Sequence, residues 1–171
     1  MIRPAETRDL DAVQAIYADA VLHGTASFEI DPPDLSEITR RWKDVHAAKL
    51  PYVVADEGGQ VAGYAYAAPY RPRPAYRFTA ECSVYVDPAH GGRGLGSALM
   101  AEVIAQTEAA GYRQMIAVIG DSANLASQRL HARLGFREVG TFGAVGFKHG
   151  RWLDTVLMQR ALGDGSETDP S

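Results

Sequence analysis

The sequence has a single cysteine, Cys82, among its 171 residues, so no disulfide can form within the chain. It also lacks an excess of basic side chains. There are 17 Lys and Arg against 21 Asp and Glu, and the formal net charge of -4 argues against a nucleic-acid partner. No apolar run approaches the ~20 residues of a membrane-spanning helix, and residues 1–17 lack the basic-then-apolar pattern of a secretory signal. We therefore expect a cytoplasmic protein that binds neither nucleic acid nor membranes.

Two common phosphate-binding motifs are missing as well. Residues 90–100 read HGGRGLGSALM, a glycine-rich stretch before an aliphatic run, but without the Lys-Ser/Thr ending of a P-loop. Ser97 stands where a dinucleotide-binding G-x-G-x-x-G motif would have its last glycine. The five histidines are scattered without metal-ligand spacing, so we expect no metal site.

What is present is an ordinary globular composition, with 46% hydrophobic and 22% charged residues. Apolar periodicity predicts four helices, over residues 7–24, 33–49, 95–111 and 124–136. Alternating or β-rich runs predict a strand over 1–5, a hairpin over 51–69, strands over 77–86 and 113–120, and a closing hairpin over 137–162.

This element order predicts an α+β fold, an α/β sandwich with a mixed sheet of six to seven strands flanked by about four helices. We expect residues 1–162 to form one domain. Residues 163–171 are small, polar and acidic, and we expect a disordered tail there.

The glycine-rich stretch lies between a strand and an amphipathic helix. A helix N-terminus carries unpaired N–H groups and a partial positive charge, so it attracts anions. Glycines at its entry remove Cβ atoms and let a phosphate approach the backbone. The alternative is a tight turn in which the glycines only permit the bend.

Several segments, taken in order, resemble the GNAT superfamily of acetyl-CoA-dependent N-acetyltransferases. They are SVYVDPAHGGRGLGSALM at 83–100, NLASQRLHARLGF at 124–136 and the hairpin before them. Within that superfamily the chain is most similar to the phosphinothricin / methionine sulfoximine acetyltransferases, through AYRFTAECSVYV, AVIG, RLHARLGF and VGFKHGRWLD. The resemblance implies a GNAT-like fold, acetyl-CoA as co-substrate, a small amino acid or analogue as acceptor, and a homodimer.

The resemblance also assigns the cofactor side of the site. Backbone amides of the strand before the glycines, at Val84, Tyr85 and Val86, would hold the pantetheine arm and thioester. The cradle for the diphosphate of coenzyme A would be Gly92, Arg93, Gly94, Leu95, Gly96 and Ser97. Gly91 departs from the Gln or Arg that is usual three residues before G-x-G, and Arg93 could compensate. Asn124 and Ser127 would contact the pantetheine arm, although Asn124 could instead only cap its helix.

Two residues are candidates for proton transfer. Glu81 opens a β-rich run, and the resembling enzymes have a glutamate here, so we expect it to be the general base; the alternative is a solvated residue at a strand edge. His131 stands where many superfamily members have a tyrosine acid, and a structural histidine is an open alternative. Beside Glu81, the Cys82 thiol should resist ionisation, so we reject an acetyl-cysteine route.

The loop PYRPRPAYRF carries arginines in a protein of negative net charge. Arginine binds carboxylates and phosphinates in a bidentate manner, so Arg71 and Arg73 are candidates for an acceptor clamp. Tyr76 adjoins them and Phe28 could supply an apolar wall; the alternative is a solvated cationic loop. The leading hypothesis is transfer of acetyl to the α-amino group of a small amino acid. The alternatives are a peptide or protein N-terminal acetyltransferase and a non-catalytic acyl-CoA-binding sensor.

Overall fold

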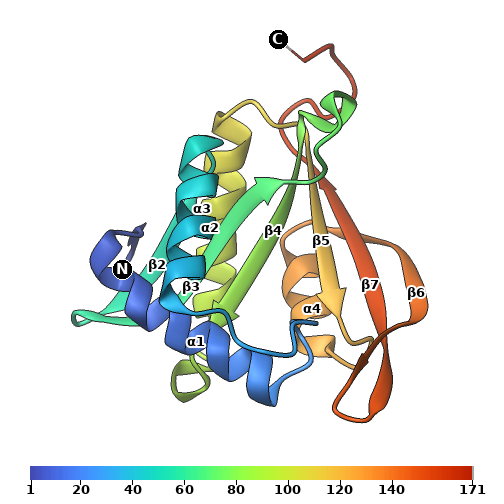
Figure 1. The fold of residues 1–171 in the computed structure, drawn as a ribbon. Helices are drawn as coiled ribbons and strands as arrows, with labels where there is room; N and C mark the ends of the chain where they lie inside the picture. Colours follow the sequence, from blue (N-terminus) through green and yellow to red (C-terminus); the bar gives the residue numbers. More distant parts are fainter. Residues whose placement is uncertain (171) are drawn as a thin grey trace.

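The computed structural model describes residues 1–170 and contains one seven-stranded mixed sheet of order β1-β2-β3-β4-β5-β7-β6. Helices α1 (Leu10–His23) and α2 (Leu35–Ala47) cover one face of the sheet, while α3 (Leu95–Ala109) and α4 (Leu125–Arg133) cover the other (Figure 1). The strands are β1 (Ile2–Pro4), β2 (Tyr52–Glu57), β3 (Gln60–Pro69), β4 (Thr79–Val86), β5 (Gln114–Gly120), β6 (Arg137–Lys148) and β7 (Arg151–Ala161). The predicted α+β fold and element order are confirmed.

Helix and turn boundaries follow local chemistry. The Asp34 side chain caps α2 by accepting a hydrogen bond from the Glu37 N–H at 2.8 Å. His149 and Gly150, with φ of 51° and 74°, form the two-residue turn between β6 and β7. The Lys-His-Gly segment therefore makes the hairpin turn that its sequence predicts.

The core lies on both faces of the sheet. Val13 and Val21 of α1 pack on one face, and Leu99 and Val103 of α3 on the other; all four are fully buried. Burying side chains of this size contributes roughly 1.5–3 kcal/mol each, so the two helix layers are fixed firmly to the strands. The loops at the strand ends are thereby held on a rigid frame.

The strands β4 and β5 are parallel neighbours that separate partway along their length. Their pairing runs from Thr79 opposite Gln114 to Cys82 opposite Ala117. Beyond that point β4 pairs only with β3, continuously to Val86, and β5 pairs with β7 as far as Gly120. Figure 1 shows the two strands diverging toward their C-terminal ends, with α4 behind the gap. The backbone groups on the inner sides of this gap are left free for a ligand.

After β7 the described chain continues to residue 170 without helix or strand. The Arg113 guanidinium donates to the Thr168 hydroxyl at 3.0 Å and to the Gly165 carbonyl at 3.3 Å. Ser171 lies outside the described residues, and the expected disorder of 163–171 stays a prediction.

Within residues 1–170, no helix has both the length and the apolar character to cross a membrane. The same part of the chain has no group of three or more His, Cys, Asp or Glu placed to hold a metal ion.

Candidate active site

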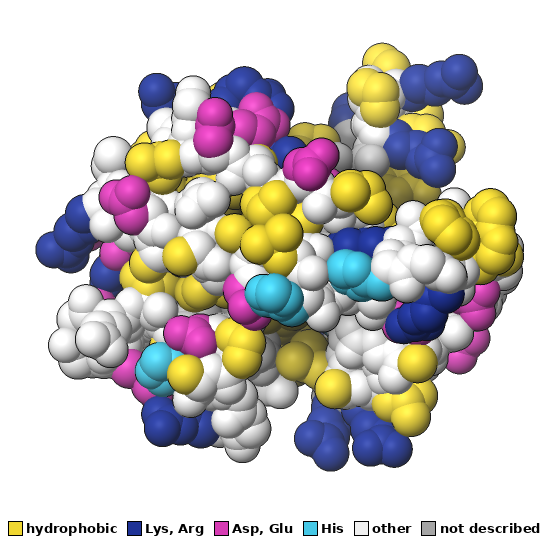
Figure 2. All heavy atoms as spheres, turned by 60° about the horizontal axis from the view of Figure 1, so that its bottom comes forward, with side chains coloured by type: hydrophobic (Ala, Val, Ile, Leu, Met, Phe, Trp, Pro, Cys, Tyr) yellow, Lys and Arg dark blue, Asp and Glu magenta, His cyan; other side chains and the backbone are white. Residues whose placement is uncertain are grey.

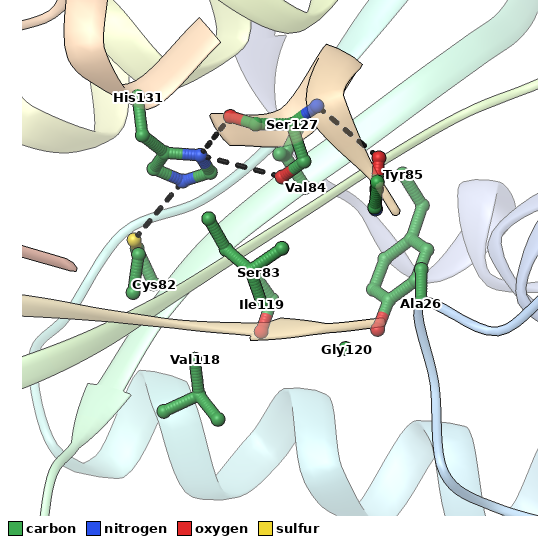
Figure 3. Close-up of a pocket in the computed structure, with 12 residues that line it drawn as sticks. Ala26, Cys82, Ser83, Val84, Tyr85, Val118, Ile119, Gly120, Ser127 and His131 are labelled. Atoms are coloured by element: carbon green, nitrogen blue, oxygen red, sulfur yellow. Dashed lines mark hydrogen bonds between the residues drawn. The ribbon is translucent and has the colours of Figure 1, made fainter. Parts of the chain in front are cut away.

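The gap between β4 and β5 forms a cleft that passes through the sheet. It is lined from β4, β5, α4 and the loop after α1 by Ala26, Cys82, Ser83, Val84, Tyr85, Ala117, Val118, Ile119, Gly120, Asn124, Ser127 and His131 (Figure 3). Four residues that the sequence assigns to the cofactor side, Val84, Tyr85, Asn124 and Ser127, therefore share one cavity. Val86 lies at the end of β4, opposite Gly63.

Glu81 lies beside the point where the strands diverge, paired with Ala68 of β3 and Ile116 of β5. Strand alternation places it on the same face as Tyr85, whose ring packs edge-on against Tyr17 of α1 at 5.1 Å. Burial raises the pKa of the Glu81 carboxyl, and the positive charge of Arg71 opposes that rise. A carboxylate with a raised pKa is a better proton acceptor than an ordinary surface glutamate.

His131 lies on the opposite face and is only 3% exposed. Its Nδ1 is 2.8 Å from the Ser127 carbonyl oxygen, and since a carbonyl only accepts, Nδ1 carries the proton. Burial lowers the pKa of His131, which favours the neutral ring with a free lone pair on Nε2. That nitrogen is 3.8 Å from the Cys82 sulfur (Figure 3). The ring is thus arranged to accept a hydrogen bond in the cleft rather than to donate one.

Cys82 lies between His131 and the β5 backbone. Its thiol is 3.5 Å from the Ile116 carbonyl oxygen and is buried. Burial, followed by the charge of Glu81, raises the pKa of the thiol well above its usual range. The group is therefore a poor nucleophile, in agreement with the rejection of an acetyl-cysteine route.

Asn124 and Ser127 are placed by the first turn of α4. The Asn124 side-chain oxygen accepts a hydrogen bond from the Ser127 N–H at 3.2 Å, so Asn124 does cap this helix. The cap leaves the Asn124 amide NH₂ free to donate into the cleft that it lines. The capping role and a ligand-binding role are therefore compatible.

The glycine-rich stretch forms the entry to α3. Gly92 and Gly94 have φ of 76° and 77°, a region that favours glycine, and no atom lies within 4 Å of where a Cβ would be. Their backbone is therefore open on that side. Gly96 differs, because a Cβ there would lie 2.8 Å from the Leu130 side chain of α4. Its missing side chain lets the two helices pack closely.

The Arg93 side chain already has a partner. Its Nη1 lies 2.9 Å from a carboxylate oxygen of Glu57, at the β2–β3 turn. The sequence predicted that Arg93 could meet a phosphate in place of the residue missing at Gly91. To contact a phosphate, Arg93 would have to break its ion pair with Glu57 or bind both groups at once.

The arginine loop lies on the surface between β3 and β4. Arg71, Pro72, Arg73 and Tyr76 line a hollow of about 300 Å³. The Arg71 guanidinium lies over the Tyr70 ring at 5.1 Å, and its charge acts on Glu81. The structure thus brings Arg71, Arg73 and Tyr76 together in one hollow. Phe28 lies elsewhere, against Gly120 and Gly146.

A partly buried polar network near the cleft was not indicated by the sequence. The Tyr17 hydroxyl donates to the Glu29 carboxylate and lies 2.9 Å from the Ser27 hydroxyl. Arg41 of α2 binds both Glu29 oxygens, at 2.7 and 3.0 Å, and holds the pKa of Glu29 below its usual range. Glu29 is therefore an ion-pair partner rather than a second base. These residues are far apart in sequence and carry no motif.

The surface at the C-terminal end of β4 and β5 shows no single charged patch. Figure 2 brings this end of the molecule forward, with hydrophobic, acidic and histidine side chains near its centre and Lys and Arg mostly along its rim. A scattered distribution of this kind is unlike the continuous basic surface that binds nucleic acid.

Comparison with known proteins adds independent information. The sequence model of the acetyltransferase (GNAT) family matches residues 13–136. The phosphinothricin N-acetyltransferase of Alcaligenes faecalis is 52% identical over 169 residues, which is 99% of this chain and 86% of that protein. The L-methionine sulfoximine/L-methionine sulfone acetyltransferase of Pseudomonas aeruginosa is 43% identical over 163 residues, 94% of each chain.

Among solved structures, a GNAT superfamily phosphinothricin acetyltransferase from Sinorhizobium meliloti was crystallised in complex with acetyl-CoA. It matches this structure with a TM-score of 0.97 and 47% sequence identity, covering 100% of this chain and 92% of that one.

Proposed function

The chain belongs to the acetyltransferase (GNAT) family, and from that premise we propose that it acetylates a small amino acid or analogue. The acyl donor is acetyl-CoA, and the acceptor is the α-amino group of a compound of the phosphinothricin, methionine sulfoximine or methionine sulfone class. The observation that carries the proposal is the divergence of β4 and β5. Glu81 lies beside the cleft on one face of the sheet, and the α3 N-terminus and α4 lie on the other face.

The residues present fit acetyl-CoA on two counts. Gly92 and Gly94 leave the backbone at the entry of α3 open, and a helix N-terminus of this kind favours a diphosphate. The free inner edge of β4 at Val84 and Tyr85 can bind the amides of a pantetheine arm as a neighbouring strand would. Asn124 and Ser127 add polar groups on the opposite wall. Leu95, Gly96 and Ser97 contribute the first turn of α3.

Glu81 removes the proton that the attacking amine must lose, directly or through a water molecule. Acetyl-CoA, when bound, supplies the thioester carbon to which the amine adds, and the C–S bond breaks as the amide forms. Backbone N–H groups of β4 donate to the carbonyl oxygen as negative charge develops on it. The departing thiolate takes a proton from water, and this balances the proton that Glu81 has removed from the amine.

His131 acts on the thiol side of the cleft. Its Nε2 lone pair can accept a hydrogen bond from coenzyme A only once the sulfur carries a proton, that is, from the product thiol. Donation of a proton by His131 would need a second proton on the ring, and burial opposes that charge. We therefore assign His131 to binding of the product thiol rather than to acid catalysis.

The arginine loop favours an amino acid over a peptide. Arg71 and Arg73 can bind a carboxylate or phosphinate near the amine, and Tyr76 borders the same hollow. A peptide N-terminus has no free carboxylate close to its amine, so it would leave these charges unused.

A thiol-release assay with a panel of acceptors tests the proposal. The panel contains phosphinothricin, methionine sulfoximine, methionine sulfone, glutamate and a short peptide, with Glu81→Gln as the inactive control. We expect turnover of one or more of the amino acids. Activity on the peptide alone would favour a protein N-terminal acetyltransferase. Tight binding of coenzyme A without turnover would favour a sensor.

The exposed strand β6 supports a homodimer as the working form of this cytoplasmic enzyme. Five large hydrophobic side chains are more than half exposed on the β6–β7 hairpin: Val139, Phe142, Val145, Phe147 and Trp152. β6 is also an edge strand of the sheet. Apolar side chains gathered on an edge strand are typical of a surface that a second copy covers.

A further inference from the structure

The segment between α1 and α2, residues 24–34, forms part of the cleft wall without any helix or strand of its own. Ala26 lines the cleft, and Phe28, which the sequence suggested as an apolar wall, packs instead against Gly120 and Gly146. A segment of this length without internal secondary structure loses much conformational entropy when it is fixed. The position of the wall therefore depends on contacts from other parts of the chain.

Lys148 makes one of these contacts from a distance of 121 residues in sequence. Its Nζ donates to the Ser27 carbonyl oxygen at 2.8 Å, and the residue is only 4% exposed. Burial of an ammonium is unfavourable, and here burial lowers the pKa of Lys148 while Glu29 opposes the shift. At the end of a hairpin strand, a lysine would more easily extend into solvent.

The rest of the hairpin fits closely against the same segment. A Cβ on Gly146 would collide with the Phe28 ring, and a Cβ on Gly120 would lie 2.6 Å from the Thr25 carbonyl oxygen. The Thr25 hydroxyl donates to Asp121 at 2.8 Å, and Asp121 is in turn paired with Arg151 at 2.7 Å. Phe28 thus occupies a space that is open only because glycine stands opposite.

Ser27 connects Lys148 to residues at the cleft through further hydrogen bonds. Its hydroxyl accepts a hydrogen bond from the Glu29 N–H at 3.2 Å and lies 2.9 Å from the Tyr17 hydroxyl. The Tyr17 ring packs against Tyr85, which lines the cleft. Fixing Ser27 therefore fixes Phe28 on one side and the Tyr17–Tyr85 pair on the other.

We infer that Lys148 is a positioning residue for the acceptor: by holding the Ser27 carbonyl it sets the place of Ala26, which lines the cleft, and so the affinity for the amino acid. The inference rests on the proposed function, because it concerns the acceptor side of that site. Lys148 does not need to contact the acceptor or the cofactor to have this effect. The glycine cradle on the other face of the sheet should not depend on it.

The test is Lys148→Met, which keeps most of the side-chain volume and removes the donor. Lys43→Met, at an exposed lysine of α2, is the matched control. We expect an acceptor KM raised about tenfold or more, since small displacements of a site wall reduce binding strongly, and a KM for acetyl-CoA within about twofold of wild type. Folded Lys148→Met with an unchanged acceptor KM would overturn the inference.

Amide hydrogen exchange over residues 24–29 gives a readout that is independent of activity. We expect faster exchange in Lys148→Met than in wild type, and no change in Lys43→Met. If wild type acetylates nothing in the acceptor panel, the proposed function fails while exchange still tests the lysine contact. Should Lys148→Met not fold, Lys148→Gln keeps a polar group of shorter reach and should show the same shifts; unchanged exchange there would contradict the contact.

Discussion

Glu81 differs from an ordinary surface carboxylate because burial raises its pKa. It is partly buried at the point where two strands separate, and only Arg71 offsets the effect of burial on its pKa. Glu81→Gln keeps the shape and removes the base. We expect kcat to fall about a hundredfold or more, with the KM for acetyl-CoA unchanged. Steady-state kinetics on folded protein would check this; near-normal turnover would remove Glu81 from the mechanism.

The raised pKa of Glu81 also has a consequence for pH dependence. A base must be deprotonated to act, so activity should fall as pH drops through the pKa of Glu81. Because that pKa is raised, the fall should begin at a higher pH than an unperturbed glutamate, with pKa ~4.3, would give. The measurement is kcat/KM against pH. The residual activity of Glu81→Gln should not show this fall at low pH. If the fall persists in the variant, the titrating group is not Glu81.

The arginine loop gives a second prediction at the scale of single residues. Arg73→Ala removes one cation from the hollow, and a lost hydrogen bond between charged groups costs roughly 1.5–3 kcal/mol. We expect the acceptor KM to rise about tenfold or more, with little change for acetyl-CoA. Arg133→Ala, at an exposed arginine of α4, is the control. If the acceptor KM of Arg73→Ala equals that of wild type, Arg73 belongs to a solvated cationic loop and does not bind the acceptor.

At the scale of elements, the loop before α3 offers neighbouring glycines in different conformations. Gly92 has φ of 76°, so Gly92→Ala places a side chain in a region that costs it roughly 1–2 kcal/mol. Gly91 has φ of -63° and tolerates alanine. We expect Gly92→Ala to weaken coenzyme A binding about tenfold, and Gly91→Ala to leave it near wild type. Calorimetric titration measures both; equal affinities would argue against the open backbone as the diphosphate site.

The elements themselves were predictable because each carries its own pattern. The α3 helix has an apolar face, and the glycines directly before it suggest anion binding from the local sequence alone. The β-rich run that Glu81 opens likewise predicted strand β4. Local signals of this kind do not depend on the rest of the fold.

Contacts across the fold were not predictable in the same way. Lys148 lies in the closing hairpin that the sequence predicts, but its burial against Ser27 is a contact between residues 121 positions apart. The partner of Arg93, Glu57, lies in a different hairpin turn. The tautomer of His131 follows from the Ser127 carbonyl, which only the folded helix brings within 2.8 Å. A single sequence gives no signal for such contacts, because covariation between residue pairs can be seen only in an alignment of homologues.

At the scale of the whole molecule, the exposed apolar side chains of β6 and β7 lead to a prediction about assembly. Trp152 is 65% exposed and packs edge-on against Phe147 at 5.2 Å. A charged side chain at position 152 is unfavourable only if a partner subunit buries it. We expect wild type to run as a dimer and Trp152→Glu as a monomer in light scattering after gel filtration. Lys43→Glu, on α2, is the control; a wild-type monomer at micromolar concentration would contradict the prediction.

The close packing of α3 on α4 at Gly96 and Leu130 has a consequence for the choice of acyl donor. Both helices also pack on the sheet, α3 on β3 and β4 and α4 on β5, so the fold sets the spacing from the entry of α3 to the β4–β5 gap. Only a carrier arm of matching length brings its carbonyl carbon level with Glu81. Donors built on a shortened arm, such as an acetylated cysteamine joined directly to the nucleotide, would bind at one end and fall short at the other.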